Sequence, residues 1–160
     1  MWAGWRSEYI EDVTSRPPDG QCVFCAILGS GRSDEQNHVL WRSELAVAIL
    51  NAYPYTNGHL MVLPLRHVAG PEDLTVEESR AVWQGMAEAI GALRAAYAPD
   101  GMNVGANLGT AAGAGIPGHF HLHVLPRWSG DTNFMTSVAE TRVLPEALGR
   151  SAEKLRAAWP

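Results

Sequence analysis

Residues 119–126 of this chain read HFHLHVLP, and this stretch decides the fold. Histidine alternates strictly with apolar residues along it, and strict alternation predicts a β-strand. Successive side chains of a strand point to opposite faces of the sheet, so alternate ones lie about 6.6 Å apart on one face. His119, His121 and His123 are therefore expected to line the floor of one groove, with the intervening apolar side chains facing a core.

Three histidines on one face admit three interpretations. Imidazole titrates near neutrality, so one of them can act as a nucleophile or as a general acid–base group. Two of the three could instead hold a catalytic zinc ion, and the third interpretation is an exposed polar face without chemical function. The preceding loop, residues 107–118, favours the first interpretation, because its many small residues would let backbone N–H groups approach phosphate oxygens closely.

The segments on either side predict an α+β fold. Apolar runs of strand length occur at residues 39–42, 45–51, 60–65, 102–107 and 119–126. Because short strands precede a single long helix, we expect an antiparallel sheet of about five strands with that helix packed on it, rather than a parallel sheet. A C-terminal helix is predicted over residues 143–159.

The long helix is predicted to begin at Thr75 and to run to about Tyr97. Thr75 followed by Glu78 matches a capping box, in which each side chain satisfies the backbone N–H of the other residue. The apolar residues that recur close to the helical period are Val76, Val82, Trp83, Met86, Ile90, Leu93 and Tyr97.

Length and composition indicate one globular domain. The chain has 160 residues, of which 46% are hydrophobic and 18% charged, enough to bury a core without disulfide bonds. We divide it into an N-terminal arm (1–20), the main domain (21–135) and a helical extension (136–160). The net charge of −5 argues against broad binding to nucleic acid or to an anionic membrane. No membrane-spanning or signal segment is predicted, so we expect a soluble cytoplasmic protein.

Cys22 and Cys25 form a single C-x-x-C. Two cysteines this close make no secreted disulfide framework, and a redox pair is disfavoured because no βαβ unit surrounds them. Two interpretations stay open. The pair could be small apolar side chains in a turn, or two thiolate ligands of a structural zinc ion that needs two further ligands.

Two motifs resemble those of the histidine triad (HIT) family of nucleotidyl hydrolases and transferases. Residues 119–125 match the family's signature of three histidines alternating with apolar residues at every position. Residues 51–64, NAYPYTNGHLMVLP, are similar to the family's N-x-x-P-x-x-x-G-H-x-φ-φ-x-P segment, where φ is apolar. The resemblance covers roughly residues 22–127, and residues 1–6 and 126–135 look like the actinobacterial branch described as diadenosine tetraphosphate phosphorylases or hydrolases.

The resemblance implies a HIT-like fold, a homodimer and a role for each motif residue. His121 would be the nucleophile that attacks the α-phosphate of a nucleotide and forms a nucleotidyl–histidine intermediate. His123 would donate to that phosphate, and His119 would orient His121, partly through its backbone carbonyl. Asn51 would bind the ribose hydroxyls, and His59 would support the histidines from the neighbouring strand. The apolar residues expected to sandwich the base are Ile27, Leu50 and Met61.

The chain departs from the family pattern four residues before the first histidine. Many members carry glutamine there and some carry serine, whereas this chain has Gly115. Asn107, Thr110 or backbone N–H groups would then contact the phosphate, and Arg127 and Arg142 could add positive charge. Neither the amide nor the hydroxyl is a base near neutral pH, so the pattern favours inorganic phosphate over water as the acceptor of the nucleotidyl group.

Some family members are also similar to this chain in their cysteines. In them a histidine after the third strand and the first histidine of the triad complete a zinc site. The resemblance implies that Cys22, Cys25, His67 and His119 bind a structural zinc ion here, with His38 as the competitor of His67.

We therefore predict an enzyme that transfers or hydrolyses the nucleotidyl group of a dinucleoside polyphosphate such as diadenosine tetraphosphate. A nucleoside phosphoramidate is the alternative substrate within the same chemistry. Two alternatives belong to other classes: a non-catalytic, zinc-stabilised nucleotide-binding module, and a zinc hydrolase whose catalytic ligands are the histidines. The latter is disfavoured because no Asp or Glu stands beside the histidines as a general base.

Overall fold

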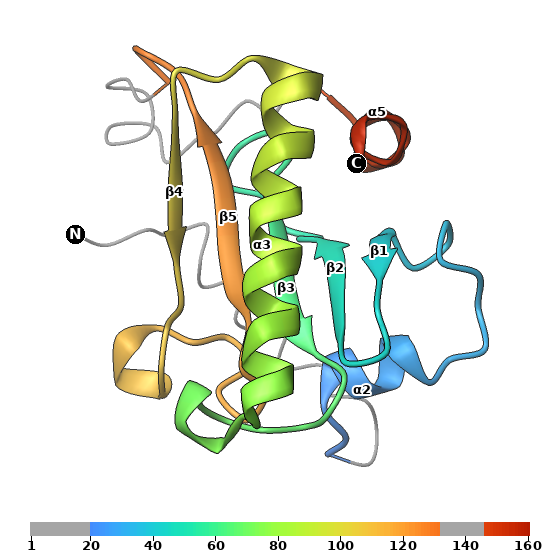
Figure 1. Ribbon diagram of the computed structural model, residues 1–160, viewed down its shortest axis with the longest axis vertical. Coiled ribbons are helices and arrows are strands. Elements are labelled where there is room, and N and C mark those ends of the chain that lie inside the picture. The colour runs from blue at the N-terminus through green and yellow to red at the C-terminus, as the bar shows by residue number, and fades with distance from the viewer. Residues whose placement is uncertain (1–19, 132–145) are drawn as a thin grey trace.

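The computed structural model describes residues 20–131 and 146–160 (Figure 1). In chain order its elements are α2 (Val23–Leu28), β1 (Val39–Arg42), β2 (Ala46–Leu50), β3 (Leu60–Pro64), the 3₁₀ helix η1 (Pro71–Asp73), α3 (Val76–Tyr97), β4 (Gly101–Gly105), the 3₁₀ helix η2 (Thr110–Ala112), β5 (Leu122–Arg127) and α5 (Leu148–Ala158). Outside the described residues lie most of the predicted arm (1–19), the end of the motif after the histidines (133–135), Arg142, and the start of the predicted C-terminal helix (143–145). In the described ranges, no helix combines the length and the apolar character needed to cross a membrane.

The strands form one antiparallel sheet in the order β1-β2-β3-β5-β4. β2 and β3 are buried along their whole length, which explains why both are continuous apolar runs in the sequence. Helix α3 runs lengthwise over one face of the sheet (Figure 1). The predicted α+β fold, with five antiparallel strands, one long packed helix and a C-terminal helix, is confirmed.

The sheet separates two apolar clusters. Because alternate residues of a strand point to opposite faces, Val62 of β3 belongs to the cluster under α3, and its neighbour Met61 belongs to the cluster around Phe24 of α2. Phe120 and Val124, which lie between and after the histidines, are buried in the α3 cluster as predicted. The face that carries α2 is therefore the face that remains for the polar residues of the histidine stretch.

Helix α3 begins with the predicted capping box. The backbone N–H of Glu78 donates to Thr75 Oγ1 at 3.2 Å, and the N–H of Thr75 donates to the Glu78 carboxylate at 2.8 Å. Val76 and Trp83 are 62% and 68% exposed and do not belong to the packed face. They lie seven residues apart, which is about two helical turns, so they share a flank that points away from the sheet. The other predicted apolar positions are buried or half-buried: Val82, Met86, Ile90, Leu93 and Tyr97.

Strand β5 begins at Leu122, so the strand predicted from His119 begins three residues too early. In the register of β3 with β5, Pro64 comes opposite Phe120. Proline has no N–H to donate, and the N–H of Phe120 donates instead to the carbonyl oxygen of Val68 at 2.6 Å. Residues 119–121 therefore lie outside the ladder that β3 and β5 form.

The sequence does not predict helix α2. The helix has six residues and no side-chain hydrogen bond at its N-cap, Cys22. A helix this short is unstable alone, and Phe24 anchors it in the core instead. The C-x-x-C thus lies at the start of a helix rather than in a turn.

The contact between Arg66 and Glu78 predicts a pH dependence of stability. Hydrogen bonds from Arg66 (2.8 and 2.7 Å) and from the Thr75 N–H lower the pKa of Glu78 from 4.5 to about 2. The unfolded chain takes up this proton at a higher pH, so the stabilisation is complete above about pH 4.5 and is lost as the pH falls toward 2. In chemical denaturation, the difference between wild type and Glu78→Gln should shrink as the pH is lowered from neutrality. Glu77→Gln, at the exposed neighbouring position, is the control, and a pH-independent difference would contradict the assignment.

Candidate functional site

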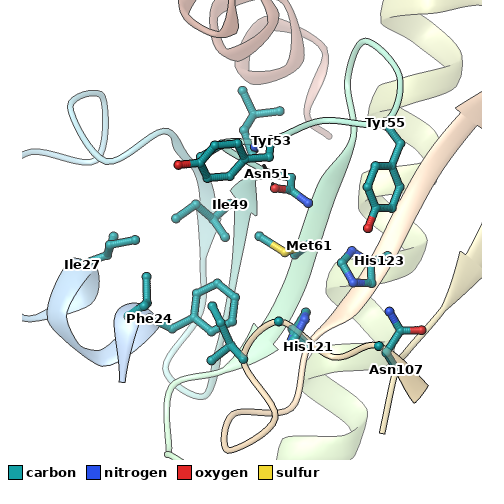
Figure 2. A pocket seen from close by; sticks show the side chains of 16 residues that line it. Phe24, Ile27, Ile49, Asn51, Tyr53, Tyr55, Met61, Asn107, His121 and His123 are labelled. Carbon is teal, nitrogen blue, oxygen red and sulfur yellow. Dashed lines mark hydrogen bonds between the residues drawn. The ribbon is translucent and has the colours of Figure 1, made fainter. Parts of the chain in front are cut away.

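A pocket opens beside α2, between that helix, the ends of β2 and β3, the loop before β5 and the histidines (Figure 2). Its volume is about 190 Å³, more than the roughly 150 Å³ that accommodates a benzene ring. The predicted site residues that line it are Ile27, Leu50, Asn51, Met61, Asn107, Gly115, His121 and His123. Segments far apart in the sequence thus meet around one cavity.

Several lining residues were not singled out from the sequence. Tyr53 and Tyr55 project from the loop after β2, and Phe24 projects from α2 between the two cysteines (Figure 2). The two tyrosines lie inside the 51–64 segment, so their position in that motif was a usable signal. No comparable signal marked Phe24, because the helix that presents it was not predicted.

Three predicted site residues lie outside the lining. His59 is fully buried behind His123, and Thr110 is exposed at the start of η2. His119 is fully buried beside the cysteines. The expectation that all three histidines of the stretch line one groove is therefore wrong for His119. It precedes β5, where the chain no longer follows the pleat that would place alternate side chains on one face.

One hydrogen bond determines the tautomer of His121. Its Nδ1 lies 2.7 Å from the backbone carbonyl oxygen of His119. A carbonyl can only accept, so Nδ1 of His121 carries the proton and Nε2 keeps its lone pair. The buried His121 ring forms part of the pocket wall and thus presents a nucleophilic nitrogen to the pocket.

A chain of hydrogen bonds gives His123 the opposite tautomer. The backbone N–H of Tyr55 donates to His59 Nδ1 at 3.1 Å, so His59 carries its proton on Nε2. His59 Nε2 lies 2.9 Å from His123 Nδ1 and donates to it. His123 therefore carries its own proton on Nε2, as a donor. A lone pair and an N–H stand side by side in the pocket, because the rings of His121 and His123 are 5.0 Å apart.

Burial keeps these rings neutral. Desolvation lowers the pKa of His119 and of His121 below 6.5. For His123, desolvation followed by repulsion from His121 lowers the pKa to about 4. At neutral pH each ring therefore has one donor and one acceptor nitrogen, as the hydrogen bonds require.

The loop before β5 brings backbone groups to the pocket. Asn107, Gly113 and Gly115 line the cavity. Gly109 and Gly113 have φ angles of 76° and 84°, a region that other residues adopt only with strain. The N–H groups of Gly113 and Ala114 donate to the carbonyl oxygens of Thr110 and Gly109, at 2.9 and 3.3 Å. These bonds close the loop beside the space that Gly115 leaves in the pocket wall.

Arg127 does not line the pocket. Its guanidinium donates to both carboxylate oxygens of Asp131, at 2.6 and 2.7 Å, and to Asn103 at 2.6 Å. The expectation that it adds positive charge if the C-terminal segment folds over the groove involves residues 132–145, which lie outside the described residues. Arg127 is the last residue of β5 and lies four residues beyond His123.

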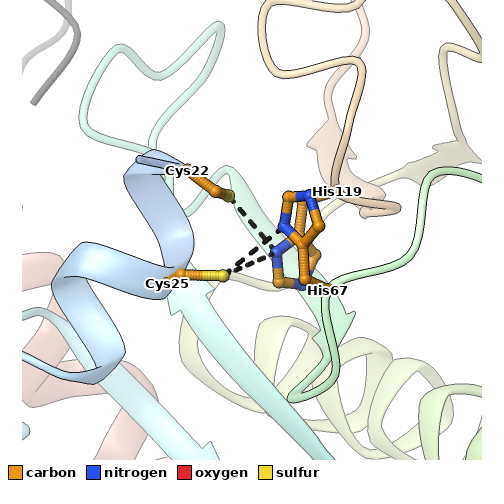
Figure 3. Close-up of side chains that lie close together, drawn as sticks. All are labelled: Cys22, Cys25, His67 and His119. Carbon is orange, nitrogen blue, oxygen red and sulfur yellow. Dashed lines mark hydrogen bonds between the residues drawn. The ribbon is translucent and has the colours of Figure 1, made fainter. Parts of the chain in front are cut away.

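A second cluster lies behind His119 (Figure 3). We call it the thiol–imidazole cluster, and it consists of Cys22, Cys25, His67 and His119, whose ligand atoms all lie within 4.8 Å of one another. His38 is not part of it, so the cluster contains His67 where the sequence left a choice. His119 Nε2 donates to the carbonyl oxygen of Pro64 at 2.9 Å, which leaves the lone pair of Nδ1 facing the thiols.

The dimensions of the thiol–imidazole cluster fit a tetrahedral ion. Cys22 Sγ and Cys25 Sγ lie 3.4 and 3.6 Å from His119 Nδ1, and Cys25 Sγ lies 3.5 Å from His67 Nδ1. Zinc bonds of about 2.3 Å to sulfur and 2.0–2.1 Å to nitrogen give tetrahedral edges of about 3.5 Å. Burial and the neighbouring Cys22 raise the pKa of Cys25 above 9.0, and a bound cation would offset both effects. The cluster can therefore bind a metal ion.

Comparison with known proteins agrees with this geometry. A family model described as "HIT domain" matches residues 32–130. The "AP-4-A phosphorylase" of Mycobacterium tuberculosis is 44% identical over 99% of this chain and 83% of its own length. The "Bis(5'-nucleosyl)-tetraphosphatase [asymmetrical]" of Schizosaccharomyces pombe is 30% identical over 59% of this chain and 52% of its own length.

A solved structure gives the same fold. A "ZN-bound histidine triad family protein" from Mycobacterium smegmatis superposes with a TM-score of 0.70 and 29% identity. The superposition covers 86% of this chain and 92% of that one.

The tautomer of His123 leads to a prediction for nuclear magnetic resonance. The long-range ¹H–¹⁵N spectrum should show His123 with its proton on Nε2 at neutral pH, and a titration midpoint near pH 4 rather than 6.5. The signal is assigned by its loss in His123→Gln. In the unfolded protein the midpoint should return toward 6.5. A folded-state midpoint at or above 6 would contradict the buried, neutral ring.

Proposed function

The chain belongs to the HIT-domain family, and on this basis we propose that it is an enzyme that transfers the nucleotidyl group of a dinucleoside polyphosphate through His121. The observation that carries the proposal is the pair of opposite tautomers in one pocket. His121 offers a lone pair, and His123 offers an N–H. Attack on a phosphoryl group needs both a nucleophile and a donor to the oxygens that gain charge.

In the first step, the Nε2 lone pair of His121 attacks the α-phosphorus. The bond between this phosphorus and the bridging oxygen breaks, and its electron pair leaves with the rest of the polyphosphate. With diadenosine tetraphosphate the leaving group is ATP, and AMP remains attached to His121. The Nδ1 proton of His121 stays on the ring and is donated to the carbonyl oxygen of His119, which stabilises the positive charge that the ring acquires.

His123 and the loop before β5 stabilise the phosphoryl oxygens. His123 donates from Nε2, since its Nδ1 is occupied by His59. Asn107 supplies a further donor from its side-chain amide, whereas the backbone N–H groups of Gly113 and Ala114 already donate to the carbonyl oxygens of Thr110 and Gly109. Removing one such donor typically costs about 10²–10³ in rate.

The remainder of the pocket holds the nucleoside. Asn51 is fixed at the end of β2, because its Oδ1 accepts from the backbone N–H of Tyr53 at 2.9 Å, and its carboxamide binds the ribose hydroxyls. The base lies between the apolar side chains of the pocket, which are Ile27, Leu50 and Met61.

Inorganic phosphate is the acceptor in the second step. An oxygen of phosphate attacks the phosphorus, the P–N bond breaks, and its electron pair returns to His121 Nε2. Water would need a base to deprotonate it, and the lining contains no Asp or Glu among the described residues. Phosphate is already an anion and needs a cavity with donors, which the space at Gly115 and the side chains of Asn107 and His123 supply.

The thiol–imidazole cluster holds a structural zinc ion. Two thiolates and two imidazoles are a common tetrahedral donor set for zinc, and the second nitrogen of His119 is hydrogen-bonded, as is usual for a ligand histidine. His121 and His123 are not among the described residues whose ligand atoms converge in this cluster. Free thiols suit a reducing compartment, so we place the protein in the cytoplasm.

Two copies of the chain form the active homodimer. β4 is the edge of the sheet and is exposed along most of its length, with Val104 43% exposed. An unprotected edge strand tends to pair with another strand. Trp83 of α3, which is 68% exposed, supplies apolar area that a second copy would cover.

Product analysis tests the proposed function. Incubation with diadenosine tetraphosphate and phosphate should give ADP and ATP, and His121→Ala should lower the rate by several orders of magnitude while AMP still binds. Chromatographic separation of the nucleotides checks both outcomes. AMP and ATP at a rate indifferent to phosphate would make water the acceptor. If the protein does not turn over dinucleoside polyphosphates but cleaves a nucleoside phosphoramidate, its substrates are phosphoramidates instead.

Elemental analysis tests the zinc ion. The purified protein should contain about one zinc ion per chain. His67→Ala should lose it, whereas His38→Ala, the matched control outside the cluster, should keep it. The melting temperature of His67→Ala should no longer respond to chelator, unlike that of wild type. If the metal is retained in His67→Ala and lost in His38→Ala, His38 is the ligand and His67 is not.

A further inference from the structure

Phe24 connects the thiol–imidazole cluster with the pocket. In the sequence it lies between Cys22 and Cys25, two ligands of the cluster. In the structure its ring is 3% exposed and forms part of the pocket wall, next to Met61 and Ile49 (Figure 2). One side chain thus contacts both functional parts of the molecule.

The Phe24 ring contacts two histidines edge-on. Its centroid lies 5.4 Å from that of His119, with an interplanar angle of 79°, and 5.1 Å from that of His121, with an angle of 61°. The ring of His123 contacts His121 at 5.0 Å and 77°. The attacking ring is therefore packed between an aromatic ring and an imidazole.

Packing of this kind supplies what the hydrogen bond of His121 does not. The bond from Nδ1 to the carbonyl oxygen of His119 holds one corner of the ring, but a ring held at one corner can still pivot. Nucleophilic attack requires the reacting atoms at about 3–3.5 Å with aligned orbitals, and a displacement of about 1 Å can cost 10²-fold in rate. Rings that contact His121 from both sides restrict this pivot.

The position of Phe24 depends on the thiol–imidazole cluster as well as on the apolar cluster in which its ring is packed. Helix α2 has six residues and no side-chain cap, so its own hydrogen bonds do not hold it in place. Its first turn is tied to distant segments through Cys22, which contacts His119, and Cys25, which contacts His67 and His119 (Figure 3). A metal ion in the cluster would tighten these contacts at both ends of the Cys22–Cys25 segment.

We propose that Phe24 is a positioning residue for His121, and that the thiol–imidazole cluster acts on the reaction through it. The proposal rests on the proposed function, since it concerns the nucleophile of that reaction. It assigns the cluster a role beyond stability, because the cluster holds the side chain that orients the attacking ring.

Steady-state kinetics of Phe24 variants give the first test. Phe24→Ala should lower kcat by about 10- to 100-fold and leave the metal content unchanged, and Phe24→Leu should recover most of the loss because it refills the space. Ile27→Ala is the matched control, since Ile27 lies on the same helix and lines the same pocket. It should mainly raise KM. If Phe24→Ala also raises only KM, Phe24 contributes to binding and the proposal is overturned.

A double-mutant cycle tests the link to the cluster. In the Cys22→Ser/Cys25→Ser background, Phe24→Ala should cause much less than its loss of kcat of about 10- to 100-fold in wild type, because the side chain has already lost its support. Independent, additive losses would show that the cluster and Phe24 act separately and would overturn the link.

Spectroscopy on the wild-type protein gives a readout that needs neither turnover nor a destabilising substitution. The Hε1 and Hδ2 signals of His121, assigned by their loss in His121→Gln, lie beside the Phe24 ring and depend on its position. Metal removal by a chelator should shift them in the direction seen in Phe24→Leu, and added Zn²⁺ should reverse the shift. Unchanged His121 signals would overturn the proposal. Failure of the proposed function would appear separately, as absence of nucleotidyl transfer in wild type with these spectral changes intact.

Discussion

The pairing of β5 with β3 ends at Leu122, and the arrangement of the site depends on this limit. Pro64 offers no N–H to continue the ladder, so its carbonyl oxygen is free to accept the ring proton of His119. The other ring nitrogen of His119 then faces the cysteines. The chain also departs from the pleat, which brings the Nδ1 of His121 back to the carbonyl oxygen of the residue two before it.

The site is organised by hydrogen bonds between neutral groups rather than by charge. Each of His59, His121 and His123 has its proton position determined by a backbone group or by another ring. No Lys or Arg belongs to the described lining of the pocket. Donors from His123 and Asn107 would hold an anionic ligand there, and fixed dipoles of this kind need no reorganisation as charge develops. A net charge of −5 is therefore compatible with the polyphosphate ligand that we propose.

Local patterns in the sequence predicted the parts of the structure that depend on local interactions. The strands, the capping box of Thr75 and the long helix follow from periodicity and end signals. The late start of β5, at Leu122, depends on Pro64, which lies 55 residues before His119. Helix α2 depends on contacts with distant residues. Neither feature could therefore be predicted from its own segment. The four residues of the thiol–imidazole cluster followed from the resemblance to HIT-family members, whereas the relay through the Tyr55 N–H uses a backbone group that every residue except proline has.

His119 contributes to both the thiol–imidazole cluster and the pocket, through two different chemical groups. Its ring belongs to the thiol–imidazole cluster, and its backbone oxygen belongs to His121. Any amino acid at this position would still bring a carbonyl oxygen. Evolutionary drift could therefore remove the cysteines and this ring, provided that another contact holds Phe24, without erasing the tautomer of the nucleophile. A metal ion in the thiol–imidazole cluster would in that sense be separable from the tautomer of His121, which depends on the path of the main chain.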